Sequence, residues 1–313
     1  MSTRPSIRPV HRLALRARGA LVAGMLALLL SGSSAWAQTT TGTLDLTGPV
    51  AALEEYRRFA DTTELELFRT WAFDEAGVAT ERVLYLYDWR DGSLRERRVT
   101  LFDAGEPLAT VAYDADDQPI GQTVFRYDGE GRLVEEVTVD AEGTETRRIV
   151  YEHDAAGNIL RATLYQGGAL ARTVERDFNA DGALLEERTF DAEGRLTEVG
   201  RYVVPGLERD YVQYDEDGEV EATGRVIRNA FGTILIEVLD PDGELMESYA
   251  WTYDERGREV ERRAIYDEGQ IEELLTYVYE DDDRGSWVRQ TTTEDLGDGP
   301  ELYEIRERVI TYR

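Results

Sequence analysis

Glycine recurs along the chain at a nearly constant interval, and this spacing constrains the fold more than any other feature. One series has intervals of 24 to 26 residues, and a second series falls midway between its members. A fixed internal period in this range is typical of repeat architectures, in which each unit packs on its neighbours. Each repeat therefore contains two half-units. The first series is Gly105, Gly131, Gly157, Gly182, Gly206, Gly232 and Gly257, and the second is Gly92, Gly143, Gly168, Gly194, Gly218, Gly243 and Gly269.

Most half-units begin with an aromatic residue, an acid, two variable residues and the glycine, as in Tyr127–Gly131 and Tyr253–Gly257. An aspartate can accept a hydrogen bond from the backbone two residues on, and glycine adopts the positive φ that completes a tight turn. The segments between turns are rich in Val, Leu, Thr and Tyr, as in residues 132–139. Turns at this spacing between β-formers predict consecutive antiparallel strands. We therefore expect an all-β meander, extended or spirally wound, with about 26 residues per two strands.

Doubled charges stand at the centres of several predicted strands, in Glu135-Glu136, Glu186-Glu187 and Arg262-Arg263. Because side chains alternate along a strand, each doublet sends one charge to either face. This pattern predicts a thin sheet with both faces exposed to solvent. If Val139 pairs with Thr144 across the turn, Glu136 faces Arg147 directly.

The N-terminus has the order of a secretory signal peptide. Five arginines precede an apolar run over residues 20–30, and Ala35-Trp36-Ala37 follows. About 11 apolar residues are too few for a membrane-spanning helix, which needs about 20. We predict a signal peptide over 1–37 with cleavage near Ala37, a flexible linker over 38–52, a cap segment over 53–72 and a YD-like β-repeat domain over 73–313. The mature protein is then secreted or periplasmic.

Charge and composition exclude several functions. The chain has 64 acidic and 35 basic residues, a net charge of −29, and no cysteine. Such acidity repels nucleic acid and anionic membrane surfaces, so we expect neither a nucleic-acid partner nor membrane insertion of the mature chain. Disulfides and thiolate metal sites are impossible.

Catalytic constellations are scarce in this sequence. His11 and His153 are the two histidines, and His11 leaves with the signal peptide. A Ser-His-Asp triad and a multi-histidine metal site are therefore not available. We expect no catalytic residues and no cofactor apart from calcium. Two alternatives stay open: a glycan-active enzyme that uses paired carboxylates, and an outer-membrane-associated β protein, which the charges on both strand faces argue against.

Calcium is a possible ligand of the turns. The first half of an EF-hand loop is matched by Asp177, Asn179 and Asp181. Two shorter partial matches are the pair Asp215 and Asp217 and the pair Asp240 and Asp242. The position of the bidentate glutamate holds Arg188 instead. Turn formation alone also explains aspartate at these positions.

Tryptophan suggests a second kind of site. Trp71, Trp89, Trp251 and Trp287 could form a stripe on which glycan rings stack, or they could seal the sheet near its turns. The two roles predict different effects of alanine substitution: unfolding in the second case, and weaker glycan binding in the first.

Two strings resemble the YD repeat of RHS proteins, whose pattern is Y-x-[YFH]-D-x-x-G-[NR]-[LI]. They are Tyr151–Ile159 and Phe125–Leu133, and degenerate copies extend from about Phe73 to Glu280. The resemblance implies strands wound into a large spiral sheet, as in cell-surface, carbohydrate-associated or toxin-enclosing shells. No typical RHS core terminus or toxin domain is recognisable. We therefore expect an exported, non-catalytic β-repeat scaffold that binds protein or carbohydrate at the cell envelope.

Overall fold

The fold is taken from a computed structural model, which describes residues 44–60, 62, 64–88, 92–204, 207–215, 217–266, 270–297 and 299–313. All of them belong to one compact unit, Gln38–Arg313. The predicted signal peptide, its cleavage site and residues 38–43 of the predicted linker lie outside the described residues. Within the described part of the chain, no helical segment has the length and apolar character that a membrane crossing requires.

In the described residues, twenty strands make a single sheet, and each pairing between them is antiparallel. The all-β repetitive meander expected from the glycine spacing is confirmed. The strands are β1 (Val50–Phe59), β2 (Glu66–Phe73), β3 (Ala79–Tyr87), β4 (Leu94–Asp103), β5 (Glu106–Asp114), β6 (Pro119–Tyr127), β7 (Leu133–Asp140), β8 (Glu145–His153), β9 (Ile159–Gln166), β10 (Ala169–Phe178), β11 (Leu184–Asp191), β12 (Leu196–Val204), β13 (Glu208–Tyr214), β14 (Val220–Asn229), β15 (Gly232–Leu239), β16 (Leu245–Tyr253), β17 (Glu259–Tyr266), β18 (Gln270–Asp281), β19 (Trp287–Asp295) and β20 (Glu301–Tyr312).

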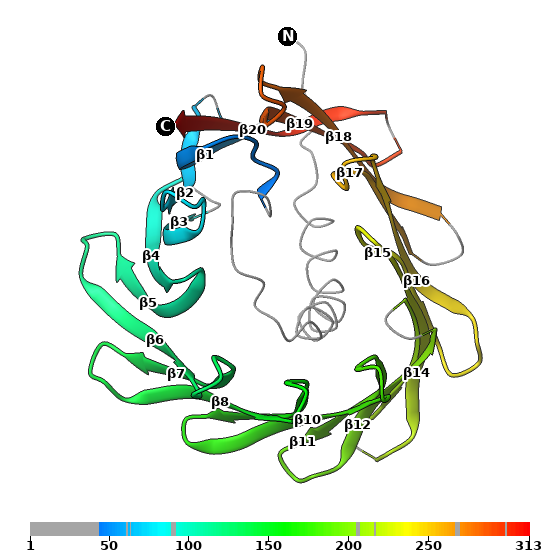
Figure 1. The fold of residues 1–313 in the computed structure, drawn as a ribbon. Coiled ribbons are helices and arrows are strands. Elements are labelled where there is room, and N and C mark those ends of the chain that lie inside the picture. Colours follow the sequence, from blue (N-terminus) through cyan, green and yellow to red (C-terminus); the bar gives the residue numbers. More distant parts are fainter. Residues whose placement is uncertain are drawn as a thin grey trace. The chain divides into compact units, whose positions relative to one another are not determined.

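The meander closes on itself, because β1 pairs with β20 as well as with β2. Figure 1 shows the blue β1 beside the dark red β20, so that the strands form a ring. Residues 53–72, expected as a cap for the first sheet edge, lie largely in β1 and β2 and are themselves part of this ring. Ring closure pairs the two edge strands with each other, which satisfies their backbone hydrogen-bonding groups. The first edge therefore needs no separate cap.

The turn motif works through its aspartate. The Oδ1 of Asp128 accepts hydrogen bonds from the backbone N–H groups of Glu130 and Arg132, at 2.8 and 3.0 Å. Gly131 has φ 78° and donates its N–H to the Asp128 carbonyl. The same pair of bonds to Oδ1 recurs at Asp74, Asp114, Asp140, Asp154, Asn179, Asp191, Asp215, Asp240, Asp254 and Asp282.

A β-bulge next to each turn corrects the predicted register. Val139 pairs with Glu145 rather than with Thr144, and one extra residue separates this pair from the next. Glu136 consequently lies opposite Ile149, and Arg147 reaches it diagonally at 3.9 Å. The predicted direct pairing of Glu136 with Arg147 was wrong, because a bulge sets two residues of one strand against one residue of the other.

The motif's tyrosine ties neighbouring hairpins together. The Tyr127 hydroxyl donates to the carbonyl of Pro107, 20 residues earlier, at 2.8 Å. Burial raises the pKa of this phenol, so it remains a neutral donor. The same 20-residue link is made by Tyr87 to Leu67, Tyr253 to Thr233 and Tyr279 to Glu259.

The ring has an inner and an outer face. Residues paired across a ladder share a face, so Leu53, Trp71, Arg82 and Thr100 belong to one face. Leu53 belongs to the same buried cluster as Leu46, which is in the blue segment before β1, and that segment lies inside the ring in Figure 1. This is therefore the inner face. Most buried strand residues lie on it, among them Glu55, Val174, Arg176, Glu187, Glu198, Arg209, Tyr211, Val226, Ile236, Leu275, Thr292 and Arg308.

Turns alternate between the two ends of the ring. We call the end with the β2–β3 and β18–β19 turns the proximal end, because residues 44–48 lie against it. The other end, with the β5–β6, β13–β14 and β15–β16 turns, is the distal end. The motif's ring residue is on the inner face at proximal turns, as at Tyr127, and on the outer face at distal turns, as at Tyr214. The two ends therefore differ in which face the motif covers.

Candidate functional site

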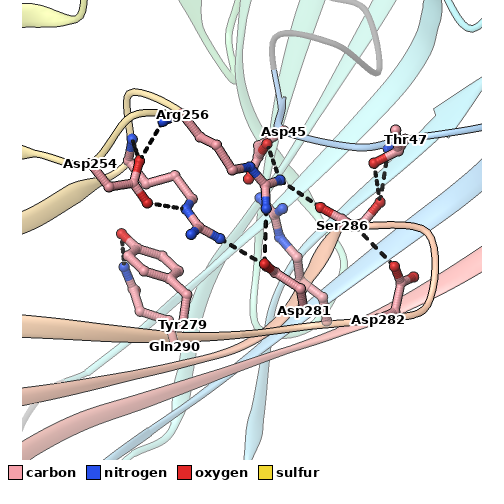
Figure 2. Close-up of polar contacts among 12 residues, drawn as sticks. Asp45, Thr47, Asp254, Arg256, Tyr279, Asp281, Asp282, Ser286 and Gln290 are labelled. Carbon is pink, nitrogen blue, oxygen red and sulfur yellow. Dashed lines mark hydrogen bonds and ion pairs between the residues drawn. The ribbon is translucent and has the colours of Figure 1, made fainter.

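A polar cluster fastens the N-terminal segment to the proximal end. Arg256 forms ion pairs with Asp45 at 2.6 Å and with Asp281 at 2.9 Å, and Arg258 pairs with Asp281 at 2.8 Å (Figure 2). Arg258 also donates from Nε to Asp254, the aspartate of its own turn. Arg256 thus connects the segment before β1 to the next hairpin of the ring, and Arg258 connects its own turn to the same hairpin.

Ser286 completes this attachment. It is fully buried, and its Oγ accepts a hydrogen bond from the Thr47 backbone N–H at 2.8 Å, as Figure 2 shows. Arg308 donates to the carbonyl of Leu44 at 2.9 Å. Apolar packing adds to these bonds, since the cluster of buried residues here comprises Leu46, Val50, Leu53, Trp71, Phe73 and Ala79. We call this arrangement the proximal clasp.

Charged side chains are buried on the inner face further along the ring. Arg176 donates to Glu187 at 2.7 Å, and Arg209 lies between two glutamates, 2.6 Å from Glu198 and 3.3 Å from Glu187. All four residues are under a tenth exposed. Burial raises the pKa of Glu198, while Arg209 opposes that shift. Glycine makes the arrangement possible, because a Cβ on Gly200 would stand 1.8 Å from the Arg209 Nε.

A second buried charge cluster lies under the clasp. Glu55 is 4% exposed and forms ion pairs with Arg69 and Arg308. Burial acts to raise the pKa of Glu55, but the two arginines outweigh it and lower the pKa below its ordinary value. The Arg308 guanidinium also lies 3.5 Å from the centre of the Trp287 ring, within cation–π range.

The distal turns β13–β14 and β15–β16 depart from the motif in one respect. At Asp128, Asp154, Asp191 and Asp254, the second carboxylate oxygen accepts a bond from the arginine or asparagine after the turn glycine. Glu219 and Glu244 occupy that position in the two distal turns. Glu219 and Glu244 therefore place a second acid beside Asp215 and Asp240, at the position where three other turns place Arg132, Arg195 and Arg258.

The residues proposed for calcium lie in three separate turns. Asp177 is on β10 and pairs with Arg188 at 2.9 Å, and Asn179 uses Oδ1 to accept two backbone N–H groups. Asp181 is exposed in the same proximal turn. Asp215 and Asp217, and Asp240 and Asp242, belong to the two distal turns. Over the described residues, no group of three or more potential ligands comes together.

The tryptophans do not form one stripe. Trp71 packs in the clasp between Phe73 and Phe102, and Trp287 lies under Arg308 with Tyr279 at its edge. Trp251 is half-buried on β16 and stacks on Tyr249, with ring centroids 6.2 Å apart. Trp89 lies outside the described residues.

Sequence reasoning missed the buried ion pairs. Glu187 and Glu198 stand in the same sequence pattern of turns and strands as exposed glutamates do. The sequence therefore does not distinguish these buried glutamates from the exposed ones. One signal was present: Gly200 and Gly224 lie inside strands rather than in turns, and glycine within a strand marks a close approach of another group. At Gly224 that group includes Tyr211, whose hydroxyl would lie 2.4 Å from an added Cβ.

Comparison with known proteins gives one family and several distant structures. The RHS repeat family model matches residues 127–169. A porin-like protein from Bacteroides uniformis is 11% identical, covers 85% of this chain and 98% of its own, and has a TM-score of 0.38. A porin-like protein from Bacteroides vulgatus is 8% identical, with coverages of 84% and 99% and a TM-score of 0.27.

The TcdB2-TccC3-Cdc42 complex is 14% identical over 77% of this chain, with a TM-score of 0.20, and the chain spans 18% of the length matched there. No curated protein matches the chain. With all three TM-scores below 0.5, no property of these structures is transferred to this chain. The family match covers β7, β8 and β9 with their turns, where the bonds of Asp128, Asp140 and Asp154 give the YD motif its physical basis. Residues 127–169 therefore match the RHS repeat, and the resemblance to RHS and YD-repeat proteins is confirmed over that stretch.

Proposed function

We propose that the mature chain is an exported, non-catalytic β-repeat scaffold that binds a protein or glycan at the cell envelope. One observation carries this proposal: the same turn motif is used differently at the two ends. At the proximal end its side chains are consumed in contacts that hold the ring together. At two neighbouring distal turns the residues two positions after the turn glycine are presented to solvent, with Val220 40% and Leu245 38% exposed, whereas Leu133, Ile159 and Leu184 at the matching proximal positions are buried. A rigid framework with a separate display surface is typical of a binding protein.

The outer face supports a water-facing scaffold rather than the outer-membrane alternative. Ion pairs lie near the middle of its strands, such as Arg188 with Glu186 on β11 and Arg225 of β14 with Asp210 of β13. A lipid-facing strand position requires apolar side chains, and a charge at the bilayer midplane costs about 2–4 kcal/mol. Each of these outer-face pairs would carry that cost in a membrane.

The proposal is tested first by location. A C-terminally tagged chain should fractionate with the periplasm or the medium in a form that has lost residues 1–37. An Ala37→Arg substitution, at the predicted cleavage site, should leave an uncleaved precursor. A processed protein found in the cytoplasm would contradict the export proposal.

Binding is tested by site-specific photocrosslinking in intact cells. A photoreactive residue at Leu245, at the distal end, should give a discrete crosslinked product that survives stringent washing. The matched control is Leu160, which is 39% exposed but follows a proximal turn. Equal crosslinking from both positions would argue against a dedicated display surface.

A further inference from the structure

Two neighbouring distal hairpins expose apolar side chains on the outer face. Val220 pairs with Tyr214 across the β13–β14 ladder, and Leu245 pairs with Leu239 across the β15–β16 ladder. Val220, Leu245 and Met246 are 40%, 38% and 43% exposed. Since β14 and β16 both flank β15 in the ring, the two hairpins present these side chains at neighbouring distal turns.

Matching positions at the proximal end are covered. Leu133, Ile159 and Leu184 stand two residues after their turn glycines, as Val220 and Leu245 do, and they are 6%, 7% and 9% exposed. The motif itself therefore does not require exposure at this position. Grouped apolar side chains left on the surface and rimmed by polar residues are typical of an interaction site.

The rim of this surface has one sign of charge. Residues 213–224 and 239–253, which include both turns, contain no basic residue. The exposed acids among them include Asp215, Asp217, Glu219, Glu221, Asp242 and Glu244. Because Glu219 and Glu244 replace the arginine or asparagine of other turns, these like charges repel one another in the free protein. Such a local departure from the pattern of a repeat is found in proteins at functional positions.

We propose that this surface, which we call the distal strip (Val220, Leu245 and Met246 with the acids of residues 215–221 and 240–244), docks a protein segment in which basic and apolar residues alternate. The inference rests on the proposed function and names the chemistry of its partner. The apolar side chains of the segment bury Val220, Leu245 and Met246, and its arginines or lysines take the place of the missing turn cation. Opposite charge steers such a segment to the surface and fixes its orientation.

The test uses the exported, processed protein and a fluorescent 12-residue peptide of alternating Arg and Leu. We expect saturable binding, weakened about tenfold or more by the triple variant Val220→Ser, Leu245→Ser, Met246→Ser, a factor that corresponds to about 1.4 kcal/mol. The variant Glu219→Arg, Glu244→Arg should weaken binding to a similar extent. The matched proximal variant Glu130→Arg, Glu255→Arg, which reverses two exposed turn charges, should bind as the parent does.

Control peptides separate this proposal from simpler ones. A peptide of alternating Arg and Ser should bind more weakly than the Arg–Leu peptide; equal binding would reduce the strip to an electrostatic surface and overturn the proposal. A titration of the protein with calcium alone is a further experiment. Calcium binding that the double arginine variant abolishes, together with peptide binding that neither distal variant changes, would make the two turns a metal site instead. Thermal unfolding and circular dichroism establish that every variant remains folded.

The outcome also separates this inference from the broader function. If the crosslinked envelope partner persists when the strip is altered, the protein is a binding scaffold that uses another surface, and only the strip is rejected. If no partner crosslinks from any exposed position while the Arg–Leu peptide still binds the distal strip, the proposed binding property of the strip is kept and the proposed role at the cell envelope is rejected.

Discussion

The proximal and distal ends of the ring are built from the same turn, yet the N-terminal segment is fastened to the proximal end, whereas two neighbouring distal turns are exposed and acidic. The aspartate and glycine behave alike at both, since Asp128 and Asp240 each accept two backbone N–H groups through Oδ1. What differs between the ends is the face on which the aromatic position falls. The residue after the glycine varies from turn to turn, since Arg132 at a proximal turn and Arg195 at a distal turn make the same bond, whereas Glu244 replaces them at another distal turn. The backbone geometry of the turn is therefore the same at both ends of the ring. The contacts that each end makes depend on the residues that vary between copies of the turn.

Half-unit length explains why the faces differ. Successive motifs are separated by about 13 residues, and the intervening strand runs from one end of the ring to the other. Because side chains alternate along that strand, the motif aromatic changes face between Phe125–Tyr127 at a proximal turn and Tyr113 at a distal one. The ring residues on both faces are half-buried, as at Tyr127 on the inner face and Tyr113 on the outer face. They differ in what covers them: Tyr127 donates to the Pro107 carbonyl, and the Arg97 guanidinium lies over the Tyr113 ring.

The largest expected difference between the ends concerns a buried charge under the clasp. Glu55→Gln leaves Arg69 and Arg308 without their carboxylate partner, and breaking a buried pair costs about 3–5 kcal/mol. Glu244→Gln at the distal end should change the free energy of unfolding by less than about 0.5 kcal/mol. Urea unfolding of both variants measures the contrast. Equal effects would show that the inner-face charge is not sequestered.

Glu55 also predicts how stability varies with pH. Its folded-state pKa lies below the ordinary value of 4.5, so the folded form binds fewer protons than the unfolded chain in this range. The stabilisation is thus present above pH 4.5 and is lost as the pH falls through the lowered pKa. The melting temperature of the parent should fall between pH 5 and pH 3 more steeply than that of Glu55→Gln. Parallel curves would contradict this assignment.

A pair of leucines gives the next contrast. Leu53 is fully buried in the clasp, and Leu53→Ala should cost about 2–5 kcal/mol through lost burial and a residual cavity. Leu245→Ala, at a residue 38% exposed in the distal strip, should cost less than about 1 kcal/mol. Thermal unfolding of the two variants provides the comparison. A large loss at Leu245 would mean that the strip is part of the core rather than a display surface.

The link between hairpins offers a smaller test. Tyr127→Phe removes the hydroxyl that donates to the Pro107 carbonyl and should cost about 0.5–1.5 kcal/mol. The ring of the side chain stays in place, so packing is preserved. Hydrogen exchange around residues 105–108 should rise, because the neighbouring turn loses its tie. Unchanged protection there would show that the ladder alone holds adjacent hairpins.

Much of this architecture follows from the sequence, and the limits have physical causes. The turn positions follow from Asp and Gly because their conformational preferences are local. The register over Val139 and Glu145 was missed, because a bulge adds a residue that the sequence does not mark. Ring closure was missed as well, since β1 and β20 are distant in the chain and their pairing depends on the accumulated curvature of the whole sheet.

The candidate site was harder to predict than the fold. Glu198 becomes buried only because Arg209 lies across Gly200, which requires three strands to be in register. The distal strip was visible in part, as the run of acids at Asp215–Glu221 and Asp240–Glu244, but the calcium motif was the nearest interpretation. Exposure of Val220 and Leu245 depends on the face to which their strands turn them, and that required the full set of pairings.

The smallest expected effect restores the motif at the distal end. Glu244→Arg places a cation after the turn glycine, where Arg132 and Arg258 donate to their turn aspartates. It should therefore stabilise the fold by a few tenths of a kcal/mol, as exposed ion pairs do, and the gain should shrink in 1 M salt. Glu130→Arg, in a proximal turn whose cation is already present, is the control and should give no gain. If Glu244→Arg destabilises the protein, the glutamate has a structural role in its own turn, and the repulsion assigned to the distal end does not exist. A gain in stability accompanied by loss of Arg–Leu peptide binding would instead show that stability and recognition compete at this one position.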